Sequence, residues 1–151
     1  MKRSHSRNAF TLIEVLIVVI IMAVLAATII PQFSASTEDA KASSLDFNLH
    51  TMQTQLELFK LHHLGTLPTI TDFVDQMTKA TNVSGGFTGD TPYGPYIQGE
   101  IPYNPFNNSN VVTSVATEGT EPTAVVGGGT DGWQYDASTG RIYPNNSEFY
   151  E

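Results

Sequence analysis

Apolar residues fill the N-terminal part of the chain with almost no interruption. From Phe10 to Ile30, a run of 21 residues, only Thr11, Glu14 and Thr28 are not hydrophobic. A helix rises about 1.5 Å per residue, so this run would be about 31 Å long and would match a hydrocarbon layer of about 30 Å. The pattern predicts a membrane-spanning helix.

A second pattern follows, in which apolar positions recur every three or four residues between roughly residues 36 and 64. Ser36 and Thr37 precede two acids, which suits a helix N-terminus, and Gly65 and Pro68 suit its end. This spacing places one apolar stripe along a helix. We expect the stripe to pack on the protein's own sheet, because a coiled coil would need a longer run with flanking charge pairs. Its members are Ala42, Leu45, Leu49, Met52, Leu56 and Phe59.

The remainder of the chain indicates a short helix and then a sheet. Residues 69–80 predict a helix that is capped by Thr71 or Asp72 and buries Phe73, Val74 and Met77. From residue 82 the chain is rich in Gly, Pro, Asn, Thr and Tyr, with short β-like runs, and residues 133–143 predict a hairpin with a loop at residues 136–140. Helices followed by about four antiparallel strands give an α+β layout.

Charge is segregated along the sequence. Lys2, Arg3 and Arg7 precede the apolar run without any acid, whereas the rest of the chain has four cations against all 15 acids. The positive-inside rule places the short basic leader in the cytoplasm and the bulk of the chain on the far side of the membrane. The absence of a cationic cluster argues against nucleic-acid binding.

Glu14 distinguishes two interpretations of the apolar run. The uninterrupted stretch from Val15 to Ala27 has 13 residues and is followed by small residues at 34–36, which also fits an ordinary signal peptide. A carboxylate in the apolar layer costs a few kcal/mol, so it usually has a partner, and no basic residue lies within a turn. A cut between Ala9 and Phe10 would create a partner, because the new α-amino group of Phe10 is positive at neutral pH.

The stretch "AFTLIEVLIVVIIMAVLAATIIPQF" resembles the N-terminal segment of type IV pilins and of type II secretion pseudopilins. The resemblance implies that a prepilin peptidase cuts after Ala9 and methylates the amine of Phe10. It also implies that Glu14 then pairs with the Phe10 amine of an adjacent subunit, so that burial of the charge favours the correct axial register. The family normally has glycine before the cut, where this chain has Ala9.

Pro31 leaves two alternatives open. Proline removes a helical hydrogen bond and biases the preceding residue away from helical dihedral angles. It is therefore either the end of the membrane helix or, as the resemblance implies, a hinge at which the helix kinks or melts during assembly. No glycine occurs between Phe10 and Phe33 to offer another weak point.

Candidate metal ligands are sparse. His62 and His63 point to different sides of a helix and have no evident third ligand, so we expect polar ends favoured by the helix C-terminus rather than a metal site. The resemblance implies a calcium-binding C-terminal loop, for which Asp131 and Asp136 are the candidates and a solvated turn is the alternative. We expect no cofactor, and the absence of nucleotide-binding, hydrolase and metal-ligand motifs gives no support to an enzyme.

The sequence thus predicts a pilin fold, in which a long N-terminal helix with a membrane half and an amphipathic half packs on a small antiparallel sheet. The expected domains are a leader at 1–9, a transmembrane and assembly helix at 10–33 and a periplasmic globular domain at 34–151. The leading hypothesis is a structural subunit of a type II secretion pseudopilus, because many pilins close a C-terminal loop with a disulfide and this chain has no cysteine.

The alternatives are a type IV pilus pilin, major or minor, and a secreted soluble binding domain. As partners we expect further copies of the chain and other pilin-like subunits in a filament, the prepilin peptidase and methyltransferase, and an inner-membrane assembly platform. The expected location is the inner membrane before assembly and the pseudopilus or pilus afterwards.

Overall fold

The computed structural model describes residues 11–150, and of residues 30, 31 and 33–35 it describes the main chain only. The elements along the chain are the helices α1 (Leu12–His62) and α2 (Phe73–Thr78), the strand β1 (Val112–Ser114), the 3₁₀ turn η1 (Gly127–Gly129), the strands β2 (Trp133–Asp136) and β3 (Arg141–Pro144), and the 3₁₀ turn η2 (Ser147–Phe149). The chain divides into two compact units, residues 1–40 and 41–151. The predicted domain boundaries at residues 9 and 33 stay predictions.

Helix α1 is one helix of 51 residues, where the sequence suggested two stretches separated at Pro31. The interpretation of Pro31 as the end of the membrane helix is therefore wrong. A proline inside a helix removes one hydrogen bond and costs about 3 kcal/mol, and hydrogen-bonded turns on both sides outweigh this cost. In the turn before it, the Thr28 hydroxyl donates to the Leu25 carbonyl at 2.9 Å, so this polar group is satisfied within the helix.

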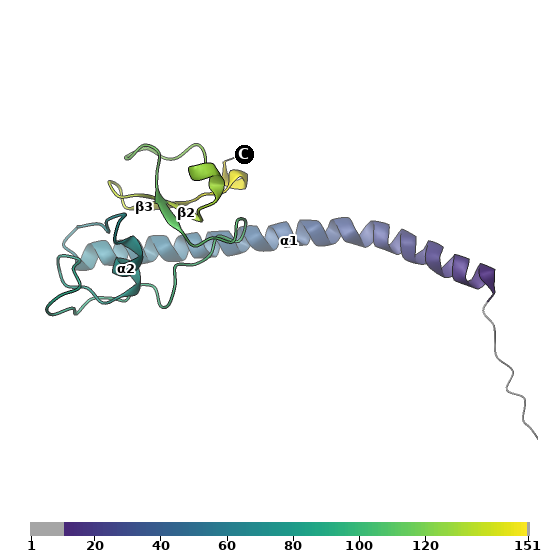
Figure 1. The fold of residues 1–151 in the computed structure, drawn as a ribbon, viewed down its shortest axis with the longest axis horizontal. Coiled ribbons are helices and arrows are strands. Elements are labelled where there is room, and N and C mark those ends of the chain that lie inside the picture. Colours follow the sequence, from purple (N-terminus) through teal and green to yellow (C-terminus); the bar gives the residue numbers. More distant parts are fainter. Residues whose placement is uncertain (1–10, 151) are drawn as a thin grey trace, which may run out of the picture. The chain divides into compact units, whose positions relative to one another are not determined.

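The core of the second unit forms between the C-terminal part of α1, α2 and the sheet (Figure 1). The predicted stripe on α1 supplies Leu45, Met52, Leu56 and Phe59 to this core, and Leu49 packs at its margin. They contact a cluster from the rest of the unit that includes Phe73, Met77, Trp133, Tyr135 and Ile142. The prediction that the stripe packs on the protein's own sheet is confirmed, except that Ala42 is exposed.

In the part of the chain that the structure describes, three strands form one sheet in the order β1-β2-β3. β2 and β3 form the predicted hairpin, in which Asp136 pairs with Arg141, so Asp136 belongs to the strand and not to the loop. β1 runs parallel to β2, which corrects the expectation of about four antiparallel strands. Parallel neighbours require a crossover connection, and the irregular segment at residues 115–132 supplies it. The α+β class with a long N-terminal helix and a small sheet is confirmed.

Helix α2 is shorter than predicted, with Asp72 at its N-cap position. Phe73 and Met77 are buried as expected, because residues four apart share a helix face. Val74 is 47% exposed, so its predicted burial is wrong. A step of one residue turns a side chain by about 100° around the helix, away from the face that packs.

Candidate functional site

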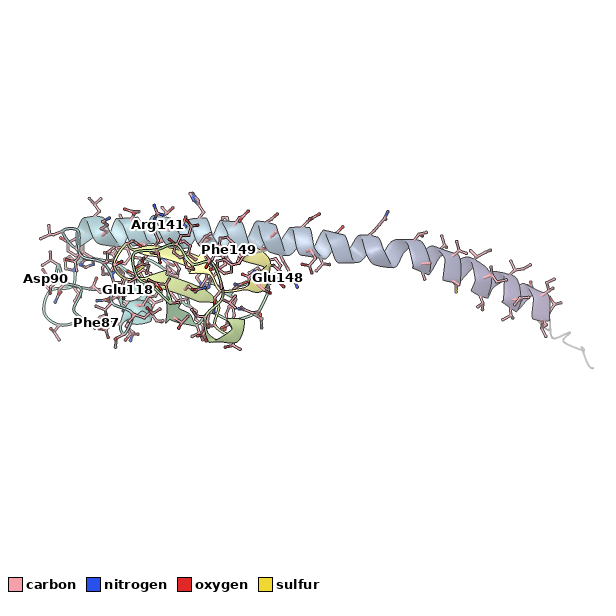
Figure 2. All side chains as sticks on the ribbon, turned by 90° about the horizontal axis from the view of Figure 1, so that it is seen from above. Phe87, Asp90, Glu118, Arg141, Glu148 and Phe149 are labelled. Carbon is pink, nitrogen blue, oxygen red and sulfur yellow. The ribbon has the colours of Figure 1, made fainter. Side chains whose placement is uncertain are left out.

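The N-terminal part of α1 exposes apolar side chains on every side. Leu12–Ile29 forms an 18-residue segment with a mean hydropathy of 3.0, and none of it is buried within the protein. Its side chains project into the surroundings along the whole segment (Figure 2). A helix of this length and composition meets the requirement for crossing a bilayer. A surface of this kind needs lipid or other helices around it.

Glu14 is the acidic residue of this segment, and it contacts Thr11 at the helix start. The main-chain N–H and the hydroxyl of Thr11 both donate to Glu14 Oε2, each at a distance of 3.4 Å. In return, the Glu14 N–H donates to the Thr11 hydroxyl at 3.3 Å. This reciprocal arrangement is a capping box, which satisfies donors that a helix N-terminus otherwise leaves without partners. Glu14 therefore has a local partner within its own chain.

The capping box was readable from the sequence, because a threonine followed three residues later by a glutamate is its signature. Sequence reasoning missed it and looked only for a cation beside Glu14. Ala9 and Phe10, the predicted cleavage and methylation residues, lie outside the described residues. At Pro31 the described main chain is helical, and the hinge hypothesis stays a prediction.

The two histidines near the end of α1 take part in a buried polar cluster. His63 is 1% exposed, so the expectation of a polar helix end is wrong for this residue. Its Nδ1 lies 3.1 Å from the Val83 carbonyl, and its Nε2 lies 3.2 Å from the Thr81 hydroxyl and 3.1 Å from the Tyr96 hydroxyl. Since the carbonyl can only accept, Nδ1 donates to it, and Nε2 lies within hydrogen-bond distance of both hydroxyls.

This cluster gives His63 a structural role. The imidazole ring also stacks on Phe59, with ring centroids 3.9 Å apart, and His62 Nδ1 lies 3.1 Å from the Tyr96 hydroxyl. The contacts join the end of α1 to the segment that includes residues 81–96. Among the described residues, no group of three or more His, Cys, Asp or Glu side chains is arranged to hold a metal ion.

Asp136 is fully buried at the start of the hairpin loop. Its Oδ1 accepts from the Ser138 hydroxyl at 2.7 Å and from the Ser138 N–H at 2.9 Å, and its Oδ2 accepts from the Gly119 N–H at 2.8 Å. Burial by itself raises the pKa of Asp136, but these hydrogen bonds, with a further one from Thr139, lower it to about 2. The carboxylate fixes the hairpin loop and attaches the segment around Gly119 to it.

The implied calcium site does not fit this geometry. Asp131 precedes β2 and Asp136 ends it, so their Cα atoms lie at opposite ends of this segment, roughly 15 Å apart at about 3.3 Å per residue. Calcium requires six to eight oxygens at about 2.3–2.6 Å, which these two side chains cannot supply together. Asp136 also directs both of its oxygens to donors within the hairpin and the 119 segment. The interpretation of Asp136 as a solvated turn residue is equally wrong.

Comparison with known proteins supports a pilin-like subunit. Residues 4–30 match the prokaryotic N-terminal methylation motif. Together with the long N-terminal helix and the small sheet, this motif defines the class as a pilin-like protein. A second family match, which shows a structural role and not an enzymatic one, identifies the kind of pilin-like protein. Residues 32–141 match the family described as type II secretion system (T2SS), protein G.

The chain therefore belongs to the type II secretion system protein G family, the major pseudopilins. The "Type II secretion system core protein G" of Vibrio cholerae serotype O1 is 27% identical over 103 residues, covering 64% of this chain and 70% of the relative. The protein of the same description from Pseudomonas aeruginosa is 30% identical over 61 residues, covering 40% of this chain and 43% of the relative. No solved structure matches the chain significantly.

Family membership decides between the hypotheses drawn from the sequence. It confirms the type II secretion pseudopilin over the type IV pilus pilin and over a secreted domain with an ordinary signal peptide. It also implies a pseudopilus polymer and processing by a prepilin peptidase.

Proposed function

We propose that this pseudopilin is cut between Ala9 and Phe10, is methylated on the new amine of Phe10, and then polymerises through its N-terminal helix. The exposed apolar segment Leu12–Ile29, with its single carboxylate near the start, is the observation that carries this proposal. In a filament, packed helices would cover that surface. Before assembly, lipid would cover it, with the leader in the cytoplasm and the globular unit in the periplasm.

The Glu14 carboxylate would have two successive partners. In the single subunit it completes the capping box with Thr11, where both contacts to Oε2 are long, at 3.4 Å. Hydrogen bonds weaken at such distances, so the box satisfies the carboxylate only in part. In the filament, the charged amine of Phe10 from a neighbouring subunit would be a stronger partner, because pairing with an opposite charge offsets the cost of an ion in an apolar layer.

The outer face of α1 in the globular unit offers a further surface for neighbouring copies. Phe47 is 72% exposed and Leu61 is 74% exposed, and both lie away from the stripe that packs in the core. Large apolar side chains that share one exposed face of a helix are candidates for contact with a neighbouring subunit. Further copies of this chain, other pilin-like subunits and the inner-membrane assembly platform are the proposed partners.

The processing step is tested by mass spectrometry of the mature N-terminus, from cells that express the chain with a matched prepilin peptidase. The expected product begins at Phe10 and carries one methyl group on its amine. Ala9→Gly should speed processing and Ala9→Leu should stop it, because a peptidase that binds the scissile bond beside the start of a helix would leave little room for the residue before the cut. A wild-type chain that keeps its first nine residues, or that begins at Thr37, would contradict the proposal.

The assembly step is tested with Glu14→Ala, scored by the yield of sheared filaments. The variant should insert into the membrane at least as well as wild type, since it lacks the costly carboxylate, and should fail to assemble. Glu118→Ala is the matched control, because Glu118 is an exposed carboxylate of the globular unit (Figure 2). Normal filament yield from Glu14→Ala would refute the pairing.

Contacts of the outer face are tested by cysteine cross-linking. The chain has no cysteine of its own, so Phe47→Cys and Leu61→Cys introduce single reactive sites. Cross-linked dimers should form in assembled filaments and not in detergent-dispersed subunits. An equal cross-linking yield in both states would show that this face does not contact neighbouring subunits in the filament.

A further inference from the structure

The loop before β2 contains three consecutive glycines with left-handed main-chain conformations. Gly127, Gly128 and Gly129 have φ angles of 58°, 73° and 73°. Glycine adopts such angles readily but loses more conformational freedom on folding than any other residue. Three of them in sequence form a loop that needs external contacts to hold one shape.

Those contacts come from the side-chain amide of Asn107, which lies in the turn after Asn104. Its Nδ2 donates to the main-chain carbonyls of Gly129 at 2.9 Å, Asp131 at 2.8 Å and Asn145 at 3.1 Å. Three carbonyl oxygens from two separate segments thus converge on one nitrogen. Convergent carbonyl oxygens are also what a calcium ion would bind, so the amide occupies the position that a cation would need.

Asn145, which follows β3, provides a second amide that contacts the loop. Its Nδ2 donates to the carbonyls of Val126 and Asp131, each at 3.1 Å. Its Oδ1 accepts from the Val126 N–H at 2.9 Å and from Gln134 Nε2 at 3.0 Å. Asn145 is fully buried, and the Asp131 carbonyl accepts from both asparagines. The loop is therefore attached at both of its ends.

We propose that the side-chain amides of Asn107 and Asn145 fix the glycine loop in place of a bound calcium ion. The acidic residues that would have to ligate calcium lie at opposite ends of β2, and the carbonyls that line the loop already accept from amide donors at 2.8–3.1 Å. The shape of the loop is then a property of the polypeptide alone. The stability of the globular unit is consequently independent of calcium.

The first test compares thermal unfolding of the full chain in detergent with and without calcium. Trp133 is the only tryptophan of the chain and is fully buried, so its fluorescence reports unfolding of the globular unit. The conditions are excess EDTA and about 5 mM calcium chloride, above the range of roughly 0.1–1 mM in which weak extracellular calcium modules bind. Magnesium chloride at the same concentration controls for ionic strength. Equal Tm values are expected, and a rise of several degrees with calcium alone would overturn the proposal.

The second test removes each amide. Asn107→Ala removes the donor to the Gly129 and Asn145 carbonyls, and Asn145→Ala removes the acceptor of the Val126 N–H. Each substitution should lower Tm by roughly 5–10 °C, with no recovery on addition of calcium. Asn108→Gly is the matched control, because Asn108 lies in the same turn, is exposed, and has a φ of 52° that glycine accepts. A Tm unchanged by both alanine substitutions, or a loss that calcium restores, would overturn the proposal. The wild-type comparison decides the calcium question even where a variant fails to fold.

Discussion

Replacement of Asp136 by asparagine is expected to destabilise the globular unit and to change the pH dependence of its stability. Asparagine keeps the size of the side chain and one carbonyl oxygen, which can still accept from Ser138. The second oxygen becomes an NH₂ group that faces the Gly119 N–H, now 2.8 Å from the carboxylate. Two donors would then face each other in a part-buried site, and rotation of the amide would instead lose the acceptor for Ser138.

The expected loss follows from the hydrogen bonds that change. A hydrogen bond to a charged group contributes about 1.5–3 kcal/mol, and a buried donor left without an acceptor costs about 1–3 kcal/mol. The bond from Gly119 is lost and the bonds from Ser138 become neutral, so a total of about 2–3 kcal/mol is expected. For a domain of roughly 100 residues this lowers Tm by roughly 10 °C.

The pH dependence gives a second signature of the same carboxylate. The pKa of Asp136 is lowered from 3.8 to about 2 in the folded chain. A lowered folded-state pKa contributes stability above the unfolded-state pKa, and this contribution is lost as pH falls through the folded-state pKa. The Tm difference between wild type and Asp136→Asn should therefore be constant from neutral pH to about pH 4 and should shrink between about pH 4 and pH 2.

The assay is thermal unfolding at several pH values, followed by tryptophan fluorescence of the full chain in detergent. Asp90→Asn is the control, because Asp90 is an exposed carboxylate in a loop of the same unit (Figure 2). Two results would refute the reasoning: equal Tm for Asp136→Asn and wild type at neutral pH, or a Tm difference that persists unchanged at pH 2.

Three further substitutions probe other buried contacts, each by urea unfolding. Gly132→Ala should cost about 3 kcal/mol, because a Cβ at this position would collide with the Ser109 carbonyl oxygen; an unchanged midpoint would contradict this close approach. His63→Phe should keep the aromatic stacking but leave the Val83 carbonyl without its donor, at a cost of about 1–2 kcal/mol, with faster hydrogen exchange in residues 81–96; unaltered exchange would argue against the cluster. Tyr135→Phe removes a buried hydroxyl donor and should cost about 1 kcal/mol, whereas a gain in stability would show that the bond is not needed.

Patterns with a local period were enough to predict much of the fold. The apolar run, the stripe on α1 and the hairpin at residues 133–144 were recognisable because helix and strand periodicities fix which residues share a face. The capping box of Thr11 and Glu14 was equally local and could have been predicted, since its two residues are only three positions apart at the start of one helix. Glu14 was also identifiable from the sequence alone, because it is the one carboxylate within a run of apolar residues.

Only the tertiary structure decided which strands pair and which polar groups are buried. β1 lies parallel to β2 because a crossover segment brings them together, and no local pattern encodes that choice. The hydrogen-bond partners of the Asn107 amide are carbonyls 22 to 38 residues away in the sequence, and those of His63 include a group 33 residues away. A polar side chain looks the same in the sequence whether it faces solvent or fixes a distant loop through hydrogen bonds. The difference depends on which distant segments leave their main-chain groups without partners, and this is fixed only when the chain has folded.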